Sequence, residues 1–235
     1  ELIIIILLIQ LIAIVGANRP RLYWTFAAAQ SIGAVPVPVY SDAVAEEMSY
    51  VLDHAGVKFA VVQDQEQVDK VLSFREQIPS LSQIIYDEAR GLRDYSHDGL
   101  NDFAKVQALG TAAMQADGGR GARWEDGIRN ASGDDVTVML YTSGTTGRSK
   151  GVMIIAAGAV EAAVGTASFD NLSEKDSVLA YLPLAWVGDH YLNYAQGYVS
   201  GLCMNCPESQ QTVAQDLREI GPTFYFAPPR VFEGL

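Results

Sequence analysis

Short apolar segments alternate with helix-like segments along most of this chain, and that order limits the folds open to it. An apolar strand ending at Val15 precedes a helix-like segment with Pro20 in its first turn. A strand at residues 35–40, a helix ending at His54 and a strand at residues 57–63 follow. Strands that alternate with helices favour a parallel sheet with right-handed crossovers. We therefore predict an α/β fold in which helices flank layered parallel-sheet subdomains.

Residues with special backbone or capping preferences mark the expected ends of these elements. Asn18 is expected to cap the first helix, and Gly33 to close it in a left-handed conformation. Ser41 or Asp42 is expected to cap the second helix. The prolines within residues 35–40 place that strand at a sheet edge or a strand start, because proline cannot donate to a hydrogen-bond ladder.

The second half of the chain continues the alternation around a glycine-rich loop. A strand at residues 136–141 is expected to resume the sheet pattern, and the loop is expected to lead directly into a helix at about residues 156–167. Later apolar segments, separated by helix-like segments, predict three more strands: residues 177–183, residues 202–206 and residues 223–229.

Composition narrows the range of partners and compartments. The formal net charge of -12 makes the surface acidic, and no basic stripe interrupts it, so we expect no nucleic-acid partner. The only two cysteines, Cys203 and Cys206, form a lone C-x-x-C without the second pair that a zinc site needs. They are interpreted as ordinary thiols in a reducing cytoplasm, with a redox motif as the less favoured alternative.

Residues 1–10 are an anomalous run dominated by isoleucine and leucine. The apolar stretch at this end covers about 14 residues, which would span about 21 Å as a helix, short of the ~30 Å core of a bilayer. It therefore does not predict a transmembrane segment or a signal peptide. A cytoplasmic location is expected, and peripheral association with a membrane stays an open alternative.

The loop at residues 141–153 reads YTSGTTGRSKGVM and carries the chemistry that stands out most. Glycines let backbone N–H groups approach a ligand closely, and Lys150 adds a cation. Hydroxyl donors come from four residues: Thr142, Ser143, Thr145 and Thr146. Together these groups suit a polyphosphate. The loop is not a Walker A motif, because Ser149 stands where the second glycine would be. A flexible turn with a solvated lysine is the alternative, and it leaves the threonines unexplained.

This loop resembles the phosphate-binding signature of the adenylate-forming superfamily, which includes acyl-CoA synthetases, although the usual signature has proline where this chain has Ser149. The segments GANRPRLYWTFAAAQSIGAVPVPVY and YLPLAWVGDH are similar to two further segments of these enzymes. The segment IGPTFYFAPPRVFEGL resembles long-chain fatty acyl-CoA synthetases. The chain is most like the N-terminal part of such a synthetase.

The resemblance implies ATP-dependent activation of a fatty acid to an acyl-AMP, followed by thioester formation with coenzyme A. Fatty acid and ATP would be the substrates, and Mg²⁺ would accompany ATP. The implied phosphate-binding residues lie in the loop: Thr142, Ser143, Gly144, Thr145, Thr146, Gly147 and Lys150. Lys150 would also be catalytic, and Thr142 would contact the metal.

The second similar segment departs from the family at the position that usually holds histidine. Trp186 stands there, and His190 follows four residues later. The resemblance implies that this segment borders the acyl channel, so both residues are predicted channel residues. A core aromatic is the equally weighted alternative for Trp186, and a histidine at a helix start is the favoured alternative for His190.

Segments that the family uses for adenine, ribose and the catalytic lysine of its mobile lid are not found within residues 1–235. We therefore predict an incomplete N-terminal ATP- and acyl-binding domain that lacks the lid domain and the later part of its own domain. Alone it is expected to hold phosphates weakly at best and to turn over nothing. Two alternatives stay open: another acyl or aryl acid–CoA ligase, and a non-catalytic nucleotide-binding module.

Overall fold

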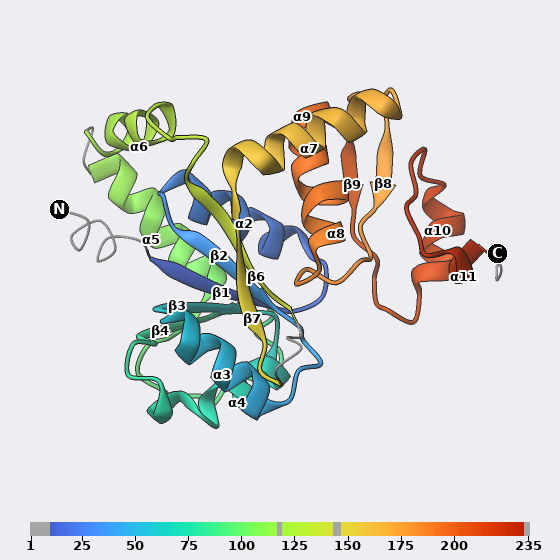
Figure 1. Cartoon of the computed structure of the whole chain (residues 1–235). Coiled ribbons are helices and arrows are strands. Elements are labelled where there is room, and N and C mark those ends of the chain that lie inside the picture. The colour runs from blue at the N-terminus through green and yellow to red at the C-terminus, as the bar shows by residue number, and fades with distance from the viewer. Residues whose placement is uncertain (1–9, 117–118, 143–146, 233–235) are drawn as a thin grey trace.

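A parallel β-sheet forms the first half of the molecule (Figure 1). The computed structural model describes residues 10–116, 119–142 and 147–232. Five strands pair in the order β2-β1-β3-β4-β5, and every pairing between them is parallel. They are β1 (Leu11–Val15), β2 (Val35–Val39), β3 (Phe59–Val62), β4 (Gln83–Tyr86) and β5 (Leu100–Asp102). The predicted α/β fold with a parallel sheet is confirmed.

Helices cover both faces of this sheet and continue through the second half (Figure 1). The structure contains α2 (Pro20–Ser31), α3 (Ala45–Ala55), α4 (Gln65–Leu72), the 3₁₀ turn η1 (Arg75–Gln77), α5 (Phe103–Ala116), α6 (Arg120–Arg129), α7 (Ala156–Phe169), α8 (Val187–Asp189), the π-helix η2 (His190–Ala195), α9 (Gln196–Ser200), α10 (Val213–Ile220) and α11 (Pro229–Phe232).

The central strand β1 is buried on both sides, which is why it reads as a continuous apolar run. Ala13 and Val15 belong to the core cluster that includes buried side chains of α3 and α4. Ile14, which points to the opposite face, packs in a second cluster with Leu22 and Phe26 of α2. The sheet is thus the middle layer between α3 and α4 on one face and α2 on the other.

Two of the four boundary predictions hold. Gly33 has a φ of 73° just beyond α2, and the proline-containing strand β2 is an edge strand. The capping predictions are wrong. Arg19, not Asn18, is the N-cap of α2, and α3 starts only after Val44, beyond Ser41 and Asp42.

Contacts with distant parts of the fold accompany both capping errors. The Ser41 carbonyl accepts hydrogen bonds from the Lys70 ammonium at 2.7 Å and the Gln67 amide at 3.1 Å. Asn18 is buried, and its amide donates to groups more than 160 residues away in sequence. Neither N-cap residue, Arg19 or Val44, makes a side-chain capping bond.

The glycine-rich loop connects two strands, which corrects the prediction that it leads directly into a helix. Strand β6 (Val136–Thr142) pairs antiparallel with β7 (Lys150–Ile155), and α7 begins only after β7. The apolar residues between the loop and the predicted helix are therefore a strand, and the helix begins at Ala156 as expected. This hairpin also stays outside the five-stranded sheet, although β6 packs beside β2.

Proline explains why β6 lies beside β2 without pairing with it. The Val35 N–H donates to the Gln10 carbonyl at 2.8 Å, on the β1 side of β2. Backbone groups alternate in direction along a strand, so Pro36 and Pro38 occupy the outward-facing positions. Neither proline has an N–H to offer. The outer edge of β2 therefore lacks donors where β6 would need them.

A small parallel pair, β8 (Ser177–Leu179) and β9 (Cys203–Asn205), completes the described strands. These two strands were expected, but residues 223–229 form no strand. They make a single bridge, between Phe224 and Val178, before Pro228 and Pro229.

Candidate functional site

The β6–β7 hairpin brings the two outer residues of the predicted phosphate loop together. Thr142 ends β6, Lys150 begins β7, and the two are direct cross-strand partners. Directly opposed residues of an antiparallel pair point to the same face, with Cβ atoms about 4.5–5.5 Å apart. Both residues are exposed. The loop end of the hairpin therefore carries a hydroxyl side chain and an ammonium side chain on the same face.

Between these two residues the structure describes only the end of the loop. Ser143, Gly144, Thr145 and Thr146 lie outside the described residues, so their phosphate-binding role stays a prediction. Gly147 has a φ of 100°, which glycine adopts readily and other residues rarely do. A Cβ built on Gly147 would meet no atom within 4 Å, so open space adjoins the backbone at this position.

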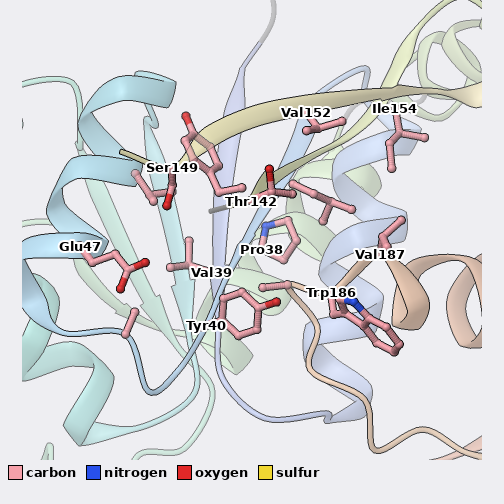
Figure 2. Close-up of a pocket in the computed structure, with 15 residues that line it drawn as sticks. Pro38, Val39, Tyr40, Glu47, Thr142, Ser149, Val152, Ile154, Trp186 and Val187 are labelled. Atoms are coloured by element: carbon pink, nitrogen blue, oxygen red, sulfur yellow. The ribbon is translucent and has the colours of Figure 1, made fainter. Parts of the chain in front are cut away.

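A cavity of about 510 Å³ lies next to Thr142. Its lining comes from the end of β2, from α3, from the hairpin and from the start of α8 (Figure 2). The lining residues are Pro38, Val39, Tyr40, Ala43, Glu47, Val51, Leu140, Tyr141, Thr142, Ser149, Val152, Ile154, Ala185, Trp186 and Val187. Figure 2 shows Thr142 between Ser149 on one side and Trp186 on the other. Most of the wall is apolar, and its polar side chains come from the hairpin (Thr142 and Ser149), from α3 (Glu47) and from the residue after β2 (Tyr40).

Trp186 and His190 lie in different surroundings, although the sequence predicted one channel for both. Trp186 lines the cavity beside Thr142, and its indole lies over Gly188, where an added Cβ would come within 2.3 Å of the ring. His190 lines a second cavity of about 240 Å³, between α2, α7 and the π-helix. The structure thus brings Trp186, and not His190, next to the predicted phosphate loop.

His190 is deeply buried and stacks on Tyr194, with the ring centroids 5.4 Å apart. Burial lowers the pKa of His190 to about 4, so the imidazole is neutral at pH 7. Its Nδ1 has no hydrogen-bond partner among the residues that the structure describes. A neutral, aromatic-packed imidazole suits an apolar wall better than proton transfer.

Asp189 lies between Trp186 and His190 in the sequence and links the segment YLPLAWVGDH to the start of α2. Its Oδ1 accepts hydrogen bonds from the Tyr23 hydroxyl at 2.8 Å, the Asn193 amide at 2.7 Å and the Asn18 amide at 3.2 Å. The Asn18 amide also donates to the Leu182 carbonyl at 2.8 Å. Burial raises the pKa of Asp189 to about 7, although these hydrogen bonds lower it. The network is buried, so we interpret it as structural.

The expectation of buried or half-buried thiols holds for Cys206, whereas Cys203 is exposed. Cys203 and Cys206 are both free thiols. Burial raises the pKa of Cys206 to about 12, so this thiol is a weak nucleophile at neutral pH.

Comparison with protein families resolves the relationship. The family model described as AMP-binding enzyme matches residues 10–235. This chain belongs to the AMP-binding enzyme family. It is 29% identical over 232 residues to long chain acyl-CoA synthetase 5 of Arabidopsis thaliana, and 26% identical over 232 residues to a long-chain-fatty-acid–CoA ligase of Homo sapiens. Each alignment covers 94% of this chain and 33% of the relative. The chain thus spans about a third of the length of these relatives.

Solved structures agree on the fold of this AMP-binding chain. An anthranilate CoA ligase, determined in complex with anthranoyl-AMP, superposes with a TM-score of 0.71 at 18% sequence identity. That match covers 93% of this chain and 40% of the ligase chain. Among the residues that the structure describes, no helix is both long and apolar enough to cross a membrane.

Sequence reasoning missed the contribution of β2 and α3 to the candidate site. Tyr40 and Glu47 line the cavity, yet neither belongs to the loop or to the second motif. One signal was available: Glu47, Tyr50 and His54 recur at helical spacing and place polar and aromatic groups on one face of α3. The sequence does not show that this face meets the hairpin, because the contact joins segments about 90 residues apart.

Proposed function

We propose that this AMP-binding chain provides the phosphate-binding part of a long-chain fatty acid–CoA ligase. The proposed enzyme activates a fatty acid with ATP to form acyl-AMP, and then forms a thioester with coenzyme A. The observation that carries the proposal is the exposed Thr142–Lys150 pair at the end of the hairpin, beside a largely apolar cavity. The names of the curated relatives support the acyl substrate class.

The chemistry assigns a clear task to the hairpin end. A carboxylate is a weak nucleophile, so its attack on the α-phosphorus of ATP depends on positioning and on neutralising charge that develops on the leaving pyrophosphate. The Lys150 ammonium supplies positive charge, and the Thr142 hydroxyl can donate to a phosphate oxygen. Ser143, Gly144, Thr145, Thr146 and Gly147 are proposed to add backbone and hydroxyl donors.

The described residues fit Mg²⁺ only in a supporting role. Thr142 offers one exposed hydroxyl oxygen, and within the described ranges no three His, Cys, Asp or Glu side chains gather to hold a metal ion. Mg²⁺ in nucleotide sites commonly keeps waters and binds phosphate oxygens. We therefore propose Thr142 as this chain's contribution to the metal, which would neutralise phosphate charge when bound.

The apolar cavity is proposed to hold the part of the acyl chain nearest its carboxyl group. Its volume falls in the range of ordinary small-molecule sites, and Trp186 supplies a broad apolar surface. His190 is kept as a proposed channel residue of the second cavity alone. A panel of fatty acids of increasing length, with aryl acids beside them, would separate a fatty acid ligase from an aryl acid ligase.

Lys150→Ala in the full-length protein tests the phosphate role. Loss of the ammonium should lower kcat/KM for ATP about 100-fold in ATP–pyrophosphate exchange, because the developing phosphate charge loses a nearby cation. Lys175→Ala removes an exposed lysine in the turn before β8 and is the matched control. This variant should keep the kinetics of the parent. Equal kcat/KM values for the two variants would remove Lys150 from the site.

A further inference from the structure

Helix α3 contacts the hairpin on both sides of the phosphate loop. On the far side of the loop, the Tyr50 hydroxyl donates to the Ser149 carbonyl at 3.1 Å. The Arg148 guanidinium lies over the Tyr50 ring, 5.2 Å from its centroid. On the near side, His54 Nδ1 is 2.7 Å from the Tyr141 hydroxyl. Helix α3 therefore contacts Tyr141, just before Thr142, and Arg148 and Ser149, just before Lys150.

The two contacting side chains form a single unit on a firmly anchored helix. Tyr50 and His54 are four residues apart, so they share one face of α3, and their ring centroids are 5.4 Å apart. The His54 ring also meets the Tyr141 ring edge to face at 5.7 Å. Met48 and Leu52, on the opposite side of α3, are fully buried in the core. The helix can therefore transmit the rigidity of the sheet to the hairpin.

The contact to Ser149 falls at the position where this chain departs from the usual signature. A proline there would fix its own φ and restrict the preceding residue to extended conformations. Ser149 provides neither restraint, so the backbone before Lys150 has more conformations open to it. The hydrogen bond from Tyr50 to the Ser149 carbonyl and the stacking of Arg148 restrain the same two residues from outside the loop.

We propose that Tyr50 and His54 are positioning residues that hold the hairpin end in place of the missing proline. They keep the Lys150 ammonium at its place opposite Thr142 and do not touch the nucleotide themselves. The inference rests on the proposed function, because it assumes that this pair binds phosphate. It adds a requirement that the loop sequence does not contain: the site depends on an aromatic pair about 90 residues upstream.

A double-mutant cycle between Tyr50 and Ser149 tests the inference in the full-length protein. Tyr50→Phe removes the hydrogen bond and keeps the ring, and it should raise KM for ATP about 3- to 10-fold and also lower kcat, because a displaced Lys150 stabilises the developing phosphate charge less well. Tyr50→Leu also removes the cation–π contact and should raise KM further. Ser149→Pro restores the local restraint, so adding Tyr50→Phe to Ser149→Pro should raise KM for ATP less than twofold. Tyr86→Phe, on β4, is the control and should leave KM unchanged.

Trypsin cleavage after Arg148 gives a readout that does not depend on nucleotide. Tyr50→Phe and Tyr50→Leu should speed cleavage at this bond in the order of their KM effects, with Tyr86→Phe cleaved like the parent. Unchanged KM values in both Tyr50 variants, or an equal effect of Tyr50→Phe with and without Ser149→Pro, would overturn the inference. If Lys150→Ala is inactive while the Tyr50 variants keep the ATP kinetics of the parent, the inference is wrong but the proposed function stands. Faster cleavage in the Tyr50 variants, with ATP kinetics unchanged in Lys150→Ala, refutes the phosphate site and with it the inferred role.

Discussion

The two halves of the molecule solve the problem of burying apolar surface differently. Residues 10–102 wrap helices around a parallel sheet and bury side chains on both of its faces. Residues 136–232 form two small two-stranded sheets and leave more large apolar side chains in solvent, including Met153 of β7 and Phe169 of α7, which is 89% exposed. The first half exposes few, among them Ile32 and Val44. The candidate site thus lies between a half whose apolar side chains are mostly buried and a half with more of them exposed.

The strongest test of this contrast compares one substitution in two helices. Val71 of α4 is fully buried, whereas Val164 of α7 is 46% exposed. Val71→Ala should lower the free energy of unfolding by about 2 kcal/mol, because it removes buried methyl groups and leaves a cavity. Val164→Ala should change it by less than about 0.5 kcal/mol. Urea denaturation measures both, and the shared helix propensity change cancels. Equal losses would mean that the second half is as closely packed as the first.

A smaller effect is expected at Asp189, where a buried polar network joins the halves. Its folded-state pKa of about 7 lies above the unfolded value of about 3.9, so the folded state holds the proton more tightly. The resulting stabilisation is complete below about pH 4 and is lost as the pH rises through 7.

Asp189→Asn keeps an acceptor oxygen and removes this titration. Relative to the parent, the variant should gain about 1–2 kcal/mol in unfolding free energy between pH 6 and pH 8. Urea melts of the two proteins at several pH values give the difference directly. Parallel stability curves would show that Asp189 stays ionised, and would assign the junction an ordinary hydrogen-bonded carboxylate.

The smallest stability effect is expected at the most exposed apolar side chain. Phe169→Ser should leave the urea midpoint nearly unchanged, because the ring is already in solvent. It should instead reduce binding of a hydrophobic dye, in proportion to the apolar surface that it removes. Phe26→Ser, in the buried α2 cluster, is the contrasting variant and should unfold the protein. A large loss of stability from Phe169→Ser would place that ring in a packed environment.

The sequence predicted the first half well because local and tertiary signals agree there. Strands β1 and β3 are apolar throughout, since both faces are covered, and Gly33 closes α2 as expected. The hairpin was harder to predict. Its second strand follows the glycine-rich segment and runs directly into an alanine-rich helix, so the sequence alone places the residues after Lys150 in the loop.

Long-range partners account for the remaining errors at the candidate site. Asn18 has the composition and position of a helix cap, but its amide instead bonds to Leu182 and Asp189. Trp186 and His190 have the spacing of neighbours on one helix face. The backbone at Trp186 is extended, however, and the helix begins only at Val187. The two side chains therefore reach different cavities, which residue spacing alone could not reveal.

The outer edge of β2, which lacks N–H donors, also determines how the hairpin is joined to the sheet. Pro36 and Pro38 leave β6 in contact with the sheet through side chains, without a shared ladder among the described residues. Side-chain interfaces can slide by small steps, whereas ladders resist any shift in register. Because β6 shares no ladder with the sheet, the contacts from Tyr50 and His54 of α3 carry much of the restraint on where the hairpin lies.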